Sequence, residues 1–285
     1  MSRKPYPSDV TDQQWALIEP LLPLDHRRSQ PGHRRAVDLR EVANALFYHA
    51  REGCSWRALP HDFPPWQTVY YYFQHWNADG RWQKLLDLLR TLARVQAGRA
   101  PTPSAAAIDS QSVKTALGGK ERGIDGGKKV HGRKRHILVD SLGFLIAVVV
   151  TAANVDDARA AQDVFAQVRG RDFPRLQVVF ADSRYHNHAL YDWLARHRRP
   201  YRLEIVSRPK GETKFKPLPV RWVVERTYAW QGRYRCLSKD YEHTPEASEA
   251  MIRIAAIHHL LQRLRPKGKP YSQRFRFKKR RKSGI

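Results

Sequence analysis

The sequence predicts an α/β fold class, in which a mixed sheet covered by helices follows a small all-α domain. Three observations predict this division. The first 100 residues carry apolar side chains at helical spacing, an Ala- and Pro-rich joint follows at residues 100–107, and short apolar runs of strand length then alternate with helical segments. With 285 residues, 41% of them hydrophobic, the chain can fill the cores of both parts.

The N-terminal part, residues 1–100, reads as helices separated by turns. The segment TDQQWALIEPLL begins with cap residues and carries apolar side chains at helical spacing. A second helix is predicted over residues 38–52, because Gly53 is a suitable helix stop. The aromatic segment WQTVYYYFQHW follows Pro65, which favours the first turn of a helix.

The second helix, a short element at residues 56–59 and the aromatic helix together fit a helix-turn-helix arrangement. The aromatic helix would then enter the major groove of DNA. The alternative is a small helical domain whose aromatic side chains only pack, and Trp66, Tyr70 and Phe73 are expected in its core. The side chains of this helix predicted to contact DNA are Gln67, Thr68, Tyr71 and Gln74.

The second part, residues 101–262, has the pattern of a mixed sheet with helices on both faces. Its predicted elements are a strand at 107–113, a hairpin at 133–152 around a turn at 141–143, a helix at 157–168, a strand at 176–181, a helix at 188–197, a strand at 201–206, and helices around residue 225 and over 246–264. Residues 263–285 contain no acid and predict a disordered basic tail, either solubilising or DNA-binding.

The charge of the chain predicts a polyanionic partner. There are 52 Lys and Arg residues against 27 Asp and Glu, a net charge of +25, and most of the excess lies after residue 100. Nucleic acid is the commonest partner at such an excess, and a solvated basic surface is the alternative. No apolar stretch is long enough to span a membrane, and the two cysteines form no disulfide framework. We therefore expect a cytoplasmic protein with no membrane partner.

Three acids stand in apolar or basic surroundings and are candidate metal ligands. Asp109 lies within a strand-like run, where a carboxylate is costly unless a cation meets it. Asp182 follows VVFA, at the carboxyl end of a predicted strand, and a helix N-cap is its alternative role. Glu225 lies in a helical segment, where an ordinary ion pair with Arg221 is the alternative.

Together the three acids predict a site for two Mg²⁺ ions, with Mn²⁺ as a possible substitute, that activates water or a 3′-hydroxyl for attack on a phosphodiester. Asp140, Asp156, Asp157, Asp240 and Glu242 remain alternative ligands. Basic residues follow the first acid and surround the third, and their alternative is a solvated loop. Those predicted to contact DNA phosphates are Lys114, Lys128, Lys129, Arg133, Lys134, Arg221, Arg233 and Lys239.

The motifs AIDSQSVKT, GKKVHGRKRHILVDSLGF, VFADSRYHN and WVVERTYAWQGRYRCLSKDYE, in this order, resemble those of bacterial insertion-sequence transposases of the DDE type, in the IS-five group. The stretches YPSDVTDQQWALIEPLLP and GCSWRALPHDFPPWQTVYYYF resemble the N-terminal DNA-binding domain of that group. Leu218 and Gly232 depart from the family pattern, which has Tyr and Lys at these positions, and Arg184 stands where many relatives have Gly.

The resemblance implies a ribonuclease-H-like catalytic domain with Asp109, Asp182 and Glu225 as its acidic triad. It also implies metal-dependent cutting at the terminal inverted repeats of an element and transfer of the 3′-hydroxyl into target DNA, by a homodimer in the bacterial nucleoid. A nuclease without strand transfer and a catalytically silent DNA-binding protein are the rival interpretations.

Overall fold

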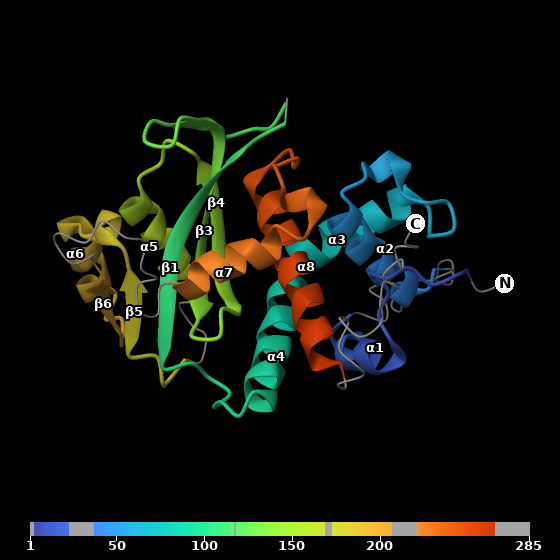
Figure 1. Cartoon of the computed structure of the whole chain (residues 1–285), viewed down its shortest axis with the longest axis horizontal. Helices are drawn as coiled ribbons and strands as arrows, with labels where there is room; N and C mark the ends of the chain where they lie inside the picture. Colours follow the sequence, from blue (N-terminus) through green and yellow to red (C-terminus); the bar gives the residue numbers. More distant parts are fainter. Residues whose placement is uncertain (1–2, 23–36, 117, 169–172, 207–221, 266–285) are drawn as a thin grey trace, which may run out of the picture.

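The computed structural model describes residues 3–22, 37–116, 118–168, 173–206 and 222–265. Figure 1 shows a sheet with helices at one end of the molecule and a helical region at the other, with α4, α7 and α8 between them. This arrangement confirms the predicted α/β class with a helical N-terminal region. No helix within these ranges is long and apolar enough to cross a membrane.

The helical region begins with a well-capped helix. The Thr11 hydroxyl accepts a hydrogen bond from the Gln14 N–H, and the Gln14 side chain returns to the Thr11 N–H, which is a capping box. Gly53 ends the second helix in the left-handed conformation, with φ of 69°. The elements are α1 (Asp12–Ile18), η1 (Glu19–Leu21), α2 (Leu39–Glu52), η3 (Trp56–Ala58), α3 (Trp66–Ala78) and α4 (Arg81–Gln96).

Aromatic stacking holds α3 against α2 and η3. The Trp56 ring lies 3.9 Å from the His49 ring and 5.2 Å from the Phe73 ring, measured between centroids. Phe73 is buried as predicted, whereas Trp66 is half-buried and Tyr70 is 36% exposed. Tyr70 was expected in the core, but its hydroxyl reaches the surface and accepts a hydrogen bond from Gln74.

The sheet has β1 at its centre. β1 pairs antiparallel with β3, which pairs antiparallel with β2 and β4, and on its other side β1 pairs parallel with β5, which pairs parallel with β6. The predicted mixed sheet and hairpin are confirmed. The strands are β1 (Ala105–Lys114), β2 (Gly123–Asp125), β3 (Val130–Asp140), β4 (Leu145–Ala152), β5 (Val178–Ala181) and β6 (Arg202–Ile205).

Helices cover both faces of this sheet because its strands carry apolar side chains alternately on each face. Ala107 and Ile137 face a first buried cluster with α7 and α8, whereas Ile108 and Leu138 face a second cluster with α5. The remaining elements are α5 (Asp157–Val168), η4 (Ser183–Tyr185), α6 (His188–Arg196), α7 (Trp222–Gln231), η5 (Arg235–Leu237) and α8 (Pro245–Leu264).

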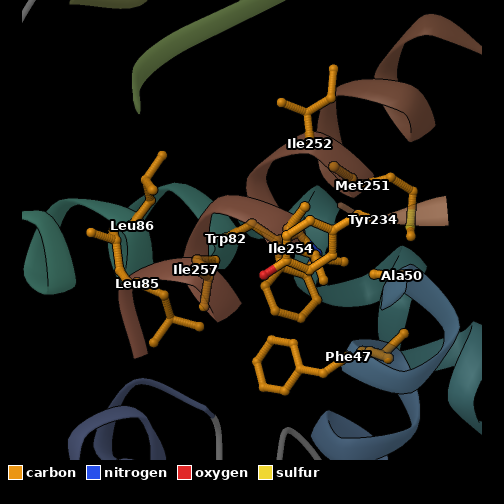
Figure 2. Close-up of a cluster of buried hydrophobic side chains, with 14 of the residues drawn as sticks. Phe47, Ala50, Trp82, Leu85, Leu86, Tyr234, Met251, Ile252, Ile254 and Ile257 are labelled. Atoms are coloured by element: carbon orange, nitrogen blue, oxygen red, sulfur yellow. The ribbon is translucent and has the colours of Figure 1, made fainter. Parts of the chain in front are cut away.

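The first buried cluster crosses the predicted boundary near residue 100. Figure 2 shows Phe47 of α2 and Leu85 of α4 facing Ile254 and Ile257 of α8. The amide of Gln14 in α1 also donates to the Leu261 carbonyl at 2.6 Å. Because α8 packs against the N-terminal helices as well as the sheet, it joins the two parts. The boundary itself stays a prediction.

The predicted basic tail begins within α8. Residues 263 and 264 are the last residues of that helix, and the Arg265 guanidinium donates to the Asp9 carbonyl at 3.2 Å. The remainder of the predicted tail, residues 266–285, lies outside the described residues.

Buried histidines make the fold sensitive to acid. Burial lowers the pKa of His49 to about 4, and burial together with nearby arginines lowers that of His258 to about 3. In the unfolded chain both imidazoles bind a proton near pH 6.5, whereas in the folded chain they stay neutral at that pH. The free energy of unfolding is therefore highest above pH 6.5 and falls as the pH drops towards 4.

We expect urea unfolding between pH 4.5 and 7 to show stability that falls with acidity. His49→Gln should reduce the slope by up to about 1.4 kcal/mol per pH unit, the linkage of one proton. His61→Gln, at an exposed position, is the control and should leave the slope unchanged. Equal slopes in the native chain and His49→Gln would contradict a neutral buried His49.

Gly132 is required where β1 meets the start of β3. A Cβ atom at this position would overlap the Val113 carbonyl oxygen in the neighbouring strand. We expect Gly132→Ala to destabilise the protein by about 1–3 kcal/mol, as overpacking does, measured by chemical unfolding. Gly126→Ala is the matched control, because a Cβ there meets nothing within 4 Å. If the Gly132→Ala protein is as stable as this control, β1 and β3 can move apart to accommodate the Cβ atom, and Gly132 is not required.

Candidate functional site

Asp109 lies in the central strand and faces the layer that contains α7. Its partner in β3, Ile137, belongs to the first buried cluster, and so does Ala107, two residues earlier on the same face of β1. The Asp109 carboxylate accepts a hydrogen bond from the Ser110 N–H at 2.7 Å and is half-buried. This acid is therefore at the edge of the core on the α7 side of the sheet.

Asp182 comes to the same level as Asp109 through the parallel pairing of β1 with β5. Ala107 of β1 pairs with Phe180 of β5. The same register, continued by two residues, makes Asp109 level with Asp182. Phe180 packs against the first cluster, and the backbone at Asp182 is still extended, with φ of −85° and ψ of 179°. Asp109 in β1 and Asp182, the residue directly after β5, are therefore level with each other and on the same side of the sheet.

Asp182 also has the local role that was its alternative. Its side chain is the N-cap of η4 and accepts a hydrogen bond from the Arg184 N–H at 2.9 Å. This contact uses only one carboxylate oxygen and fixes the direction of the side chain at the end of β5. The cap therefore orients Asp182 without excluding a ligand.

Glu225 lies in the first turn of α7 and is exposed. One turn later, the Tyr228 hydroxyl lies 3.0 Å from the Asp109 carbonyl oxygen and 2.9 Å from that of Arg135, so it ties α7 to β1 and β3. The helix that carries the third acid is thus fixed to the strand that carries the first. Arg221, and the alternative ion pair between Arg221 and Glu225, lie outside the described residues.

The structure places the three acids on one side of the sheet without closing them around an ion. Among the described residues, no three Asp, Glu, His or Cys side chains are grouped closely enough to hold a metal. The donor type nevertheless fits a hard divalent cation, because all three side chains offer carboxylate oxygens. Glu225 is exposed, so its side chain can change rotamer without disturbing the buried core.

Two tyrosines, the buried Tyr185 and the half-buried Tyr228, sense the charges of these acids. Burial, and then the negative charge of Asp109, raise the pKa of both Tyr185 and Tyr228 well above the usual value. Asp182 adds to the effect on Tyr185. Both phenols therefore stay neutral at pH 7, and the Tyr228 hydroxyl keeps the proton with which it holds α7 to the strands. The spacing of Tyr228 from Glu225 was visible in the sequence, but its contact with Asp109 was not.

Four of the five alternative acids have structural roles. Asp140 forms a buried ion pair with Arg94 at 2.5 Å, and Asp240 accepts a hydrogen bond from Ser248 at 2.7 Å. Asp156 caps the start of α5, and Asp157 forms an ion pair with Lys134 at 3.0 Å. Glu242 is half-buried, and burial and then the charge of Asp240 raise its pKa to about 7.

The structure places Arg133 and Lys134 inside the protein, contrary to the prediction that both contact DNA. Arg133 is fully buried and donates to the carbonyls of Lys120, Glu242 and His243, while Lys134 is 6% exposed. Burial opposes ionisation of Asp157, but the Lys134 ammonium outweighs it and lowers the pKa of this carboxyl. Both bases belong to β3, which begins at Val130, three residues before the predicted hairpin.

The other predicted DNA-binding residues that the structure describes lie at the surface or close to it. Lys114, Lys128 and Lys129 are exposed on or beside the β1–β3 connection. On α3, Tyr71 is 53% exposed. Thr68 is half-buried, and the remaining exposed residues are Gln67, Gln74, Arg233 and Lys239.

Loss of the Tyr228 hydroxyl should loosen α7. We expect Tyr228→Phe to lower the free energy of unfolding by about 1–2 kcal/mol, because two partly buried carbonyls lose their donor. Chemical unfolding measures this, with Tyr241→Phe at a 54% exposed position as the control. Equal stabilities of the two variants would contradict the role given to the Tyr228 hydroxyl.

Sequence comparison matches both parts of the chain to known families. The family model for the transposase DDE domain matches residues 100–261, and the model for putative transposases of the IS4/5 family matches residues 10–86. All three candidate acids lie within the first match.

Two proteins of Burkholderia cepacia are similar to this chain. The putative transposase for insertion sequence element IS402 is 30% identical over 133 residues, which cover 43% of this chain and 60% of that protein. The uncharacterized 16.2 kDa protein of insertion element IS402 is 33% identical over 118 residues, covering 40% and 78%. The chain therefore spans less than two thirds of the first of these relatives.

Solved structures show only a loose similarity. The piggyBac transposase synaptic complex with hairpin DNA gives a TM-score of 0.36 at 14% identity, covering 89% of this chain and 73% of that one. The Mos1 strand transfer complex gives 0.30 at 14% identity, covering 82% and 79%. Similarity at these TM-scores is weak, so the family assignment depends on the sequence.

Proposed function

Because the chain belongs to the family of transposases with a DDE domain, we propose that it cuts DNA at the ends of an insertion sequence and joins the freed 3′-hydroxyl to target DNA. One observation carries the proposal. The proposal is supported by the β1–β5 register, which, continued two residues beyond Ala107 and Phe180, makes Asp109 level with Asp182 on the side of the sheet that α7 covers.

The three carboxylates would hold the divalent metal that this chemistry requires. Asp109, Asp182 and Glu225 would hold two ions, for which we propose Mg²⁺ with Mn²⁺ as a possible substitute. When bound, such ions promote deprotonation of the attacking water or hydroxyl and neutralise charge on the leaving oxygen. The chain itself would orient the ligands, because the N-cap contact fixes the Asp182 side chain and the Tyr228 hydroxyl holds α7, which carries Glu225, to the backbone of Asp109.

The exposed bases would hold the DNA. We expect phosphate contacts from three lysines on the strand and connection that lead away from Asp109, which are Lys114, Lys128 and Lys129. Further phosphate contacts would come from Arg233 and Lys239, which follow α7. The exposed face of α3, with Gln67, Tyr71 and Gln74, would contact the terminal repeats. A homodimer would bring two element ends together, and a location in the bacterial nucleoid stays a prediction.

Replacing any of the three acids by its amide should abolish cutting and joining. We expect Asp109→Asn, Asp182→Asn and Glu225→Gln each to slow Mg²⁺-dependent cleavage of labelled element ends by about a hundredfold or more, because several kcal/mol of charge stabilisation is lost. DNA binding without metal should survive. Asp163→Asn, on α5 with an exposed ion pair to Arg159, is the matched control and should keep native activity.

Three outcomes would contradict the proposal. Cleavage without joining by the native chain would indicate a nuclease, and binding without metal-dependent cleavage would indicate a silent DNA-binding protein. Full activity in any of the three amide variants would remove that acid from the site. The mass of the complex on end DNA tests the dimer, because a single chain per pair of ends would contradict it.

A further inference from the structure

A strip of aromatic and basic side chains begins beside Glu225 and runs along α7 to α8. Figure 1 shows α7 leading from β1 towards α8. We call this the arginine–tryptophan strip, and its members are Trp222, Arg226, Trp230, Arg233, His259 and Arg263. Arg226 and Arg233 belong to the bases that surround Glu225 in the sequence, but the sequence did not indicate their partners on α8, which are about 30 residues away along the chain.

The strip is built from stacked planar groups. The Arg226 guanidinium lies 4.2 Å from the Trp222 ring centroid and 4.7 Å from that of Trp230, one turn away on either side. On α8, the His259 ring stacks 4.5 Å from Trp230, and the Arg263 guanidinium lies 4.6 Å from the same ring. Such stacking holds the side chains in fixed directions at the surface.

The arginines of the strip are not paired with acids within the part of the chain that the structure describes. Among the described residues, none of the guanidiniums of Arg226, Arg233 and Arg263 forms an ion pair. Asp140 is the carboxylate that acts electrostatically on Arg226, but it already forms an ion pair with Arg94 at 2.5 Å. Arg226 donates to the Leu142 carbonyl at 2.8 Å, but its buried Nε has no partner within the described chain. A partly buried cation in this state attracts an anion.

The three arginines also act on one another. Burial, and then Arg263, Arg233 and Arg226, lower the pKa of His259 to about 4, so His259 is a neutral aromatic surface at pH 7. Burial, and then Arg226 and Arg233, lower the pKa of Arg263. The charges thus repel one another, and phosphate oxygens between them would relieve this repulsion.

The exposed end of the strip suits a base. The Trp222 ring is 42% exposed and lies one turn before Glu225 on α7. Aromatic faces at such a position stack bases of any sequence, and arginines beside them hold the backbone. A strand whose phosphate lies at the three acids would therefore continue over Trp222 and then along the arginines.

We propose that the arginine–tryptophan strip binds one strand of DNA, with Trp222 stacking a base next to the cleaved phosphate and Arg226, Arg233 and Arg263 contacting the backbone as it leads towards α8. This inference rests on the proposed function for its substrate and adds the path of the strand. It concerns binding, so it can be tested without cleavage.

The first test is the salt dependence of DNA binding by the full-length chain, measured in EDTA with a duplex that carries a single-stranded 3′ extension. The double variant Arg233→Gln, Arg263→Gln should lower the slope of log affinity against log salt by about 0.7–0.9 for each phosphate that the variant no longer neutralises. Arg159→Gln, at a 60% exposed position on the opposite layer, is the matched control and should keep the native slope. A native slope in the double variant would overturn the proposal.

The second test addresses the base. Trp222→Ala should weaken binding of the extended duplex by about tenfold or more, while Trp222→Phe should keep most of the affinity, because a stacking face remains. The affinity for a blunt duplex should differ much less between these variants. Equal binding of all three forms to the extended DNA would overturn the stacking role, and thermal unfolding checks that each variant is folded.

Failure of this inference can be told from failure of the proposed function. If the native chain joins element ends while the strip variants bind and join as it does, only the strip proposal fails. If the native chain joins nothing but the strip variants lose affinity and slope, the proposed function fails and the strip remains a strand-binding surface.

Discussion

The parallel pairing of β1 with β5 is the constraint on which the candidate site depends. A shift of one residue in this register would turn Asp182 to the opposite face of the sheet from Asp109. Buried side chains on both faces oppose such a shift, since Ile108 and Val179 pack on one side while Ala107 and Phe180 pack on the other. The two acids are therefore placed by the same apolar packing that forms the sheet.

The third acid depends on a different layer. α7 is positioned by Val223 and Val224 in the first buried cluster and by the Tyr228 hydroxyl at the backbone of β1. The same cluster includes α8 and the N-terminal helices, so the helical region and the site share one core (Figure 2). The surface of α3 that we propose contacts DNA and the acids on the sheet are consequently parts of one packed body.

Much of the fold could be predicted because its signals are local. The capping box at Thr11, the left-handed stop at Gly53 and the hairpin around residues 141–143 each depend on neighbouring residues. The predicted helix at 157–168 matches α5. The burial of the bases in RKRHILVD has no local signal. Arg133 pairs with Asp240, 107 residues further along the chain, and Lys134 pairs with Asp157, 23 residues further along.

The sequence by itself determined which residues are candidates for the chemistry, because acids in apolar strands and a large excess of bases need cationic and anionic partners wherever the chain folds. It also determined the order of strands and helices, which follows from the periodicity of apolar side chains. Only the tertiary structure decided which charges reach the surface. In the folded chain Arg133 is buried and donates hydrogen bonds to backbone carbonyls, and the Arg263 guanidinium of α8 lies over the Trp230 ring of α7. The physical reason is that burial and stacking depend on contacts between segments far apart in the chain, and spacing along the sequence does not encode those contacts.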